Sequence, residues 1–220
     1  MNKTAIVIGA TGLTGTHLVA ALLQDPYFSK VRILIRKPWA HPRPGLESII
    51  VDFDDEESLA EALQGDTLFC CIGTTIKKAG TQKKFREVDF DIPVRCATIA
   101  RTNHVEQFLL ISSIGAAASS RNFYLRTKGE TEAAVLKKGF IGTYIFRPSF
   151  LIGQRKEFRL GEWIAKYLMQ LFYFLLQGRW KKYRGIKAAT VANAMLKAAK
   201  QGDAGVHIFE SDAIQQMGVS

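Results

Sequence analysis

The chain begins with a short apolar run that leads directly into a glycine-rich turn and then into a helical pattern. The run covers 4–8, the turn reads Gly9-Ala-Thr-Gly12-Leu-Thr-Gly15, and the apolar pattern continues through Leu23. A strand, a tight turn and a helix N-terminus in this order can hold the pyrophosphate of a dinucleotide. The helix offers free N–H groups and the positive end of its dipole to the anion. The sequence therefore predicts a dinucleotide site at this turn.

Each glycine of the turn has a separate role. Gly9 lets the chain leave the strand, Gly12 lets the backbone approach phosphate oxygens, and Gly15 lets the helix pack close to the sheet. The spacing is G-x-x-G-x-x-G, and no Lys-Ser/Thr follows it as in the phosphate loop of ATPases. A purely structural turn is the alternative, disfavoured by the strand before it and the helix after it. The residues expected around the pyrophosphate are Gly9, Thr11, Gly12, Leu13, Thr14 and Gly15.

Strand-like and helix-like segments alternate along the rest of the chain. Central strands that are near-continuous runs of Val, Ile, Leu and Phe indicate helices on both faces of a sheet. We predict an α/β fold, a Rossmann-type doubly wound parallel sheet in one domain (1–220), with 152–187 as a small substrate or lid region. The expected strands are 5–8, 31–35, 48–51, 67–71, 107–111, 143–146 and 206–209, and the expected helices are 13–24, 56–63, 83–102, 124–138, 161–177 and 190–200.

Composition agrees with a globular domain. Hydrophobic residues make up 47% and charged residues 23%, which does not indicate disorder. The N-terminus enters the first strand without a signal-peptide pattern, and we expect Cys70, Cys71 and Cys96 to be core thiols in a reduced compartment, so a cytoplasmic protein is predicted. The four histidines lack metal-ligand spacing, and no metal site is predicted.

The formal net charge of +10 comes from clustered basic residues. A basic surface suits nucleic acid, a membrane or an anionic small ligand. Because no nucleic-acid-binding motif accompanies the clusters, we expect a solvated basic face around a phosphate-bearing cofactor and no nucleic-acid partner.

Residues that directly follow the strands are the next candidates, because ligands of open α/β sheets bind beyond the carboxyl ends of the strands. Arg36-Lys37 follows the second strand, where an enzyme preferring NAD usually has an acidic residue. Two cations can pair with a 2′-phosphate, which favours NADP(H) over NAD(H); a surface pair unrelated to the cofactor is the alternative. We further expect Asp52 and Phe53 beside the adenine, and Ile72, Gly73 and Thr74 near the ribose and pyrophosphate.

Catalytic candidates follow the fifth strand. That strand ends in Ser112-Ser113, and Tyr124 and Lys128 lie four residues apart at the start of the next helix, hence on one helix face. A nearby cation lowers the pKa of a phenol and brings it within reach of proton transfer. A serine at the strand end can hydrogen-bond a substrate oxygen. A Tyr-x-x-x-Lys pair alone is more often a helix surface pair, but here it follows a dinucleotide turn and a Ser-Ser strand end.

Together these stretches resemble the atypical short-chain dehydrogenases/reductases, in the NAD(P)-binding NmrA-like branch, and are similar to its Tat-interacting-protein oxidoreductase group. The resemblance implies NADPH and hydride transfer with a small carbonyl or alcohol substrate. It implies Tyr124 as general acid/base and Lys128 as partner of both Tyr124 and the nicotinamide ribose. Ser113 or Ser112 would orient the carbonyl, and 148–151, with Leu151, would wall the nicotinamide. The matching motifs include Gly9–Gly15, Arg36-Lys37, Phe69-Cys-Cys-Ile-Gly-Thr-Thr75, Ser112-Ser113, Tyr124-x-x-x-Lys128-Gly-Glu130 and Phe146-Arg-Pro148.

The chain departs from the wider family in two places. Many short-chain dehydrogenases place an asparagine on the fourth helix to support a proton relay, whereas the comparable stretch here, Val88-Asp89-Phe90-Asp91, offers aspartate. Whether such a relay operates is left open. Only about 152–187 is free to form a substrate domain, which does not favour a nucleotide-sugar substrate.

The apolar stretch 163–176 is interrupted by Lys166 and Gln170 and is shorter than a bilayer span. We expect it to cover the substrate pocket or to pack on a protein partner or a second copy through 161–184. Contact with an anionic membrane surface is the alternative. A second function also stays open: a catalytically silent, NADP(H)-binding redox sensor that controls a protein partner.

Overall fold

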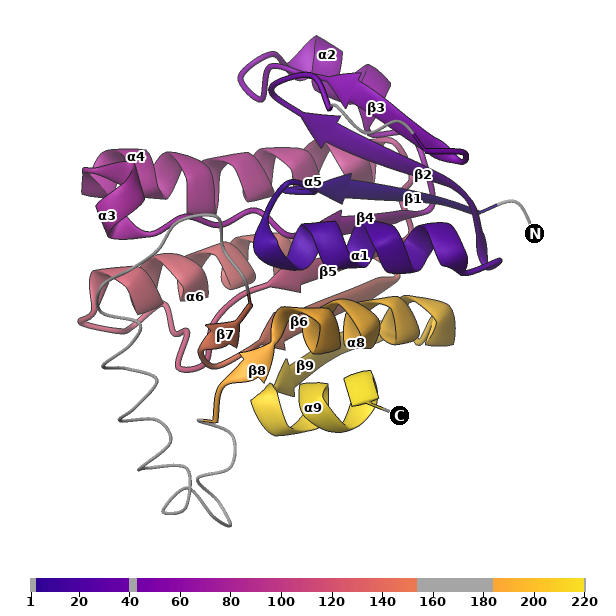
Figure 1. Ribbon diagram of the computed structural model, residues 1–220. Helices are drawn as coiled ribbons and strands as arrows, with labels where there is room; N and C mark the ends of the chain where they lie inside the picture. The colour runs from indigo at the N-terminus through magenta and orange to yellow at the C-terminus, as the bar shows by residue number, and fades with distance from the viewer. Residues whose placement is uncertain (1–2, 40–42, 154–183, 220) are drawn as a thin grey trace.

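The computed structural model describes residues 3–39, 43–153 and 184–219. In these ranges the main sheet has seven parallel strands in the order β3-β2-β1-β4-β5-β6-β9 (Figure 1). The order reverses between β1 and β4, so a crevice opens beyond their carboxyl ends, where ligands of such sheets bind. The strands of the sheet are β1 (Lys3–Ile8), β2 (Phe28–Ile35), β3 (Leu46–Ile50), β4 (Thr67–Cys70), β5 (Gln107–Ile111), β6 (Gly142–Arg147) and β9 (Gly205–Glu210).

Helices cover both faces of the sheet, which confirms the predicted doubly wound fold (Figure 1). The first core lies under α1, α8 and α9, and the second under α2, α5 and α6. The helical elements are α1 (Leu13–Gln24), α2 (Glu56–Ala62), α3 (Ile76–Ala79), α4 (Gln82–Arg86), η1 (Glu87–Asp91), α5 (Ile92–Thr102), α6 (Phe123–Leu136), α8 (Ala188–Gln201) and α9 (Ser211–Val219).

The strand β1 shows why its near-continuous apolar sequence forms a central strand. Ala5 and Val7 point into the core under α1 and α8, and Ile6 and Ile8 point into the opposite core. All four side chains are fully buried. Because side chains alternate between the faces of a strand, only a strand covered on both sides can bury every residue of such a run.

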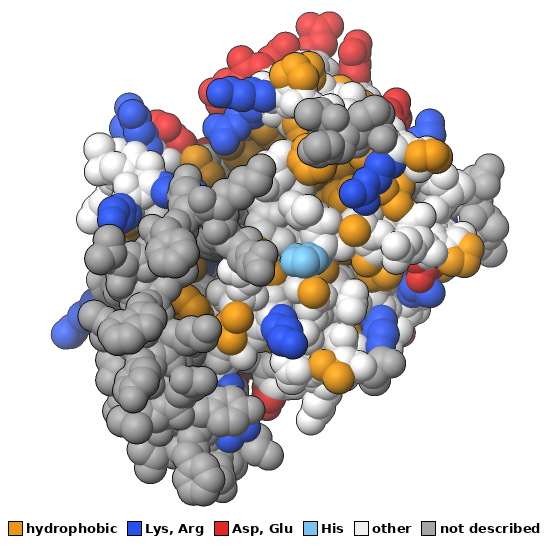
Figure 2. All heavy atoms as spheres, in the orientation of Figure 1, with side chains coloured by type: hydrophobic (Ala, Val, Ile, Leu, Met, Phe, Trp, Pro, Cys, Tyr) orange, Lys and Arg blue, Asp and Glu red, His pale blue; other side chains and the backbone are white. Residues whose placement is uncertain are grey.

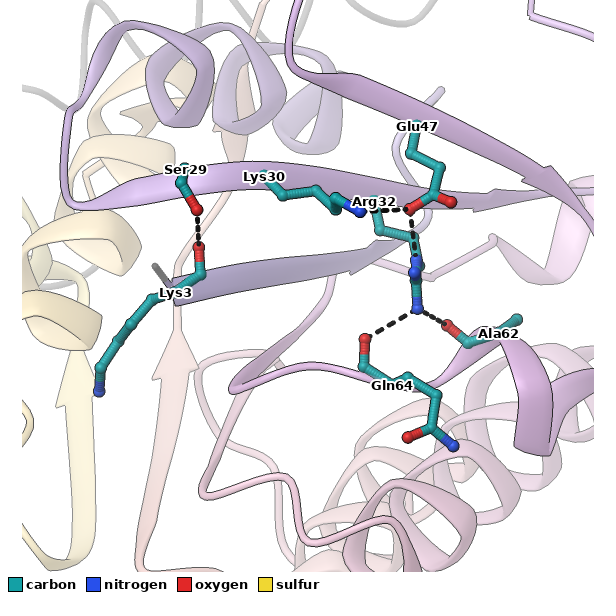
Figure 3. Close-up of polar contacts among 7 residues, drawn as sticks. All are labelled: Lys3, Ser29, Lys30, Arg32, Glu47, Ala62 and Gln64. Atoms are coloured by element: carbon teal, nitrogen blue, oxygen red, sulfur yellow. Dashed lines mark hydrogen bonds and ion pairs between the residues drawn. The ribbon is translucent and has the colours of Figure 1, made fainter. Parts of the chain in front are cut away.

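A polar cluster joins β2 and β3 at one side of the sheet (Figure 3). The Arg32 guanidinium donates to Glu47 Oε2 at 2.8 Å and to the carbonyl oxygens of Ala62 (3.2 Å) and Gln64 (2.8 Å). The last carbonyls of a helix have no partner within the helix. Arg32 therefore ties the end of α2 to the two outer strands.

The structure differs from the sequence predictions in three places. The expected helix 83–102 is divided into α4, the π-helical turn η1 and α5. The short helix α3 and the C-terminal helix α9 were not predicted. A second small sheet pairs β7 (Leu151–Ile152) with β8 (Ile186–Lys187) in parallel. The expected helix 161–177 lies outside the described residues, as does the proposed partner or membrane surface 161–184 except for residue 184.

Surface charge is uneven on the face drawn in Figure 2. Acidic side chains gather at the α2 end, while lysine and arginine side chains are spread over the described part of this face. Among the described helices, none is long and apolar enough to cross a membrane.

Candidate functional site

The glycine turn between β1 and α1 has the geometry of an anion cradle. Gly9 adopts φ +79°, a left-handed conformation that favours glycine, and the Gly12 N–H donates to the Gly9 carbonyl at 3.0 Å. Gly12 is the N-cap of α1 and supplies no side-chain cap, and the first turn of α1 holds no acidic residue. The first N–H groups of α1 are thus open to an anionic ligand.

Two glycines of the turn are required by close packing. A Cβ on Gly15 would lie 2.2 Å from the Gly9 carbonyl oxygen. A Cβ on Gly9 would lie 2.5 to 2.6 Å from the backbone of Cys71 and Ile72. The turn is therefore pressed between α1 and the segment after β4, which brings Gly9 beside Ile72, the first of the predicted cofactor residues 72–74. Thr11 and Gly12 are exposed, Leu13 is half-buried and Thr14 is buried.

The basic pair after β2 has the exposure that a phosphate contact needs. Arg36 and Lys37 are both exposed, and within the described ranges neither makes an ion pair. Asp52, after β3, is also exposed, and its carboxylate accepts the Asp54 N–H at 3.0 Å. Phe53 is 6% exposed and its side chain belongs to the core under α2 and α5, so its ring is turned into the core.

The two serines after β5 have different surroundings. The Ser112 N–H donates to the Phe146 carbonyl at 2.7 Å, which fixes this residue at the sheet edge. Its hydroxyl oxygen is buried and makes no hydrogen bond in the described part of the protein. Ser113 is half-buried, and its hydroxyl lies 3.4 Å from the Ile114 carbonyl. A buried hydroxyl without a partner is a suitable donor for a ligand oxygen.

Helix α6 presents Tyr124 and Lys128 together, as their spacing predicts. Asn122 caps the helix by accepting the Leu125 N–H at 3.2 Å, which fixes where α6 begins. The half-buried Tyr124 ring packs against the fully buried ring of Phe85 on α4, with 5.6 Å between ring centroids. This contact limits how far the Tyr124 phenol can move.

Lys128 forms a buried ion pair with Asp89. Its Nζ lies 2.7 Å from Asp89 Oδ1, and the two side chains are 7% and 0% exposed. Burial lowers the pKa of Lys128, but Asp89 and then Tyr124 raise it more, so that the pKa lies above its usual value. Lys128 is therefore held as an ammonium next to Tyr124.

Leu151, the residue predicted beside the nicotinamide, belongs to the small sheet. It lies on β7, is half-buried and packs against the core under α1. Two residues later, Gly153 is so close to the Leu13 side chain that a Cβ there would lie 2.6 Å from it. The first turn of α1 and the end of β7 are thus neighbours.

Comparison with known proteins decides what kind of crevice this is. A family model described as NAD(P)H-binding matches residues 9–157. The chain belongs to this NAD(P)H-binding family. Protein HTATIP2 of Rattus norvegicus is 35% identical over 222 residues, which cover 99% of this chain and 90% of that protein. "Protein FMP52, mitochondrial" of Candida albicans is 31% identical over 90% of this chain and 89% of its own length.

Solved structures of NAD-bound proteins share the fold of this NAD(P)H-binding protein. The Bordetella bronchiseptica enzyme WbmH in complex with NAD+ has a TM-score of 0.72 at 14% identity and covers 100% of this chain and 80% of its own. MoeE5 in complex with UDP-glucose and NAD has a TM-score of 0.71 at 16% identity, over 98% of this chain and 81% of its own. The family assignment confirms the resemblance to the atypical short-chain dehydrogenases/reductases, and these structures confirm the Rossmann-type fold.

Most of the predicted site residues of this family member lie at the carboxyl ends of the strands. The glycine turn, Gly73-Thr74, Ser112 and the Tyr124–Lys128 pair follow β1, β4 and β5 in turn. Sequence reasoning did not select Asp89 as a site residue, although the aspartate in 88–91 had been noted as a departure from the wider family. Its pairing with Lys128 depends on how α6 packs beside η1, which no sequence spacing encodes.

Proposed function

We propose that this NAD(P)H-binding protein is an NADPH-dependent oxidoreductase that reduces a small carbonyl compound, or oxidises the corresponding alcohol, at Tyr124 and Lys128. The observation that supports this most is the pairing of Tyr124 with the buried Lys128 ammonium one helical turn away. The Ser112 hydroxyl, which makes no hydrogen bond within the described residues, adds to that support.

The residues fit the cofactor that the family implies. The open N-terminus of α1 and the tight glycine packing suit a pyrophosphate, and the exposed Arg36 and Lys37 suit a 2′-phosphate. Lys128 lies under Gly73, where a Cβ would come within 3.7 Å of its Nζ, so its ammonium can reach ribose hydroxyls at this edge. When bound, NADPH would supply the hydride.

The chain supplies the proton and the orientation. In the reductive direction the Tyr124 hydroxyl donates its proton to the carbonyl oxygen as the carbonyl carbon accepts the hydride. The Lys128 ammonium stabilises the resulting phenolate, which regains its proton from solvent because Tyr124 is half-buried and not enclosed. The hydroxyl of Ser112 or Ser113 donates a hydrogen bond to the same oxygen and orients the carbonyl.

The test is a Tyr124→Phe variant assayed with NADPH against a panel of small aldehydes and ketones. The ring keeps its packing on Phe85, so we expect turnover to be lost while NADPH affinity is nearly unchanged. Tyr27→Phe, which removes a hydroxyl outside the site, is the matched control and retains turnover. Unchanged turnover in Tyr124→Phe would refute the mechanism. NADPH binding without turnover of any carbonyl by the unaltered protein would favour the catalytically silent sensor.

A further inference from the structure

Asp89, on η1, contacts two other elements, α6 and the segment after β4. Its Oδ1 pairs with Lys128 Nζ on α6 at 2.7 Å, and its Oδ2 accepts the Thr74 N–H after β4 at 2.8 Å. Its backbone carbonyl accepts a hydrogen bond from the Thr131 hydroxyl, also on α6, at 2.8 Å. Both carboxylate oxygens are thus engaged, one by a side chain and one by the backbone of the expected cofactor segment.

The position of Asp89 depends on the π-helical turn. The turn η1 inserts one extra residue into what would otherwise be a continuous helix from α4 to α5. The carboxylate is fully buried, and a Cβ on Gly73 would lie 3.5 Å from its Oδ1. Because Gly73 has no side chain, nothing from residue 73 but its backbone lies between this ion pair and the crevice.

A buried charge is stable only when it is paired, so the two residues depend on each other. Removing one partner of a buried pair leaves the other uncompensated, which is strongly destabilising. Tyr124 on α6 and Cys70 on β4 also raise the pKa of Lys128, each by less than Asp89 does. Without Asp89, burial becomes the dominant influence on Lys128 and favours its neutral form.

We propose that Asp89 is a positioning residue, whose carboxylate is held by the Thr74 N–H and in turn holds the ammonium of Lys128 next to Gly73. This inference rests on the proposed function, because it assigns Lys128 a contact with the cofactor. Asp89 acts through Lys128 and does not touch the substrate. Its full burial also means that it passes no proton directly to solvent.

The test compares Asp89→Asn with Asp91→Asn, which removes a partly exposed carboxylate from the same turn. Two quantities are measured from pH 6 to 10: the free energy of unfolding by urea without nucleotide, and NADPH affinity from its fluorescence. In Asp89→Asn the pKa of Lys128 falls below its unfolded value. The unfolded chain then binds more protons than the folded one, so stability rises with pH. The NADPH affinity of this variant falls about tenfold for each pH unit above the lowered pKa of Lys128.

The two readouts thus move in opposite directions in Asp89→Asn, while Asp91→Asn follows the unaltered protein in both. If Asp89 served only the fold, Asp89→Asn would lower the free energy of unfolding, but its NADPH affinity would keep the pH dependence of the unaltered protein. Asp89→Glu keeps the charge and retains the pH profile of the unaltered protein even if its affinity drops. If Asp89→Asn fails to fold, Asp89→Glu is used for the test instead. A pH profile of Asp89→Glu that differs from that of the unaltered protein would overturn the proposal.

A Lys128→Met variant separates failure of this inference from failure of the proposed function. If Lys128→Met loses NADPH affinity but Asp89→Asn keeps the pH profile of the unaltered protein, Asp89 does not position Lys128 and the inference is wrong. If Lys128→Met binds NADPH normally, Lys128 is not a cofactor contact, and both the inference and the role given to Lys128 fail. If the unaltered protein binds no NADPH, the proposed function itself is wrong.

Discussion

The carbonyl oxygen of Gly9 occupies the place where a side chain on Gly15 would be, 2.2 Å from the position of a Cβ. Helix α1 can therefore lie close to the turn only while residue 15 is glycine. The same contact holds the first turn of α1 against the glycine turn that follows β1. One close approach between two glycines thus sets both helix packing and the geometry of the anion cradle.

Gly15→Ala is expected to destabilise the protein. Alanine favours a helix by ~1 kcal/mol over glycine, but here its methyl group forces α1 away from the Gly9 carbonyl, as in an overpacked core, at a cost of about 1–3 kcal/mol. We expect a lower free energy of unfolding in urea and the loss of thermal stabilisation by NADPH. His17→Ala, at an exposed position on the same helix, should leave both unchanged. A gain of stability in Gly15→Ala would contradict the packing argument.

Ser112→Ala should separate folding from function. The Ser112 hydroxyl is buried without a hydrogen bond in the described residues, so its removal relieves an unsatisfied polar atom. We expect stability to stay the same or rise, while carbonyl turnover with NADPH falls. Ser113→Ala is the comparison, because that hydroxyl already lies near the Ile114 carbonyl. Should only Ser113→Ala lower turnover, Ser113 and not Ser112 orients the substrate.

Replacing Arg36 and Lys37 together by alanine should change cofactor preference and not folding. Both side chains are exposed, so the free energy of unfolding should move by less than about 0.5 kcal/mol. Each charge-assisted hydrogen bond to a 2′-phosphate contributes about 1.5–3 kcal/mol, so NADPH affinity should fall about tenfold or more while NADH affinity stays constant. Lys137 and Lys138, an adjacent pair at the end of α6, give the matched double variant for a general charge effect. Equal losses for both nucleotides would refute the 2′-phosphate contact.

The ion pair between Asp25 and Lys200 should contribute to acid sensitivity. The Lys200 ammonium lies 2.7 Å from Asp25 Oδ2 and joins the end of α1 to α8. Burial raises the pKa of Asp25, but hydrogen bonds from Lys200 and from the Tyr27 N–H lower it more, so that the net pKa is below its usual value. The folded state then binds fewer protons, and this stability is present above the unfolded pKa near ~3.9 and lost as pH falls through the lowered folded value.

In Asp25→Asn we therefore expect a smaller loss of stability than in the unaltered protein when urea unfolding is followed from pH 5 to pH 2. Glu61→Gln, an exposed acidic position on α2, should show the full loss. If Asp25→Asn loses as much stability on acidification as Glu61→Gln, the pair does not contribute to acid sensitivity.

The sequence predicted the fold well where apolar runs and turns are local signals. The runs at β1 and β5 alternate between two cores, and that pattern is visible in the chain itself. The π-helical turn at Glu87–Asp91 was missed because one extra residue barely alters helical periodicity. The strands β7 and β8 have two residues each, which is too short to produce a sequence pattern. Their pairing depends on tertiary structure.

The residues of the candidate site were likewise predictable where the signal is local in the sequence, and not where it depends on packing between elements. Tyr124 and Lys128 were identifiable because four residues of spacing on a helix place two side chains on one face. Asp89 was not, because it lies on a different element, and its contact with Lys128 depends on the packing of η1 against α6. The expectation for Phe53 beside the adenine was made from its position after β3, and the direction of its ring into the core is set by α2 and α5.

The two-residue ladder between β7 and β8 has an evolutionary consequence. Leu151 pairs with Ile186 and Ile152 with Lys187, so two positions far apart in the sequence are held side by side. The entropic cost of closing a loop grows only slowly with its length. Insertions, deletions or replacement of the whole segment between β7 and β8 can therefore accumulate without refolding the main sheet. The ladder is therefore a place where members of this NAD(P)H-binding family can differ in length while the main sheet stays unchanged.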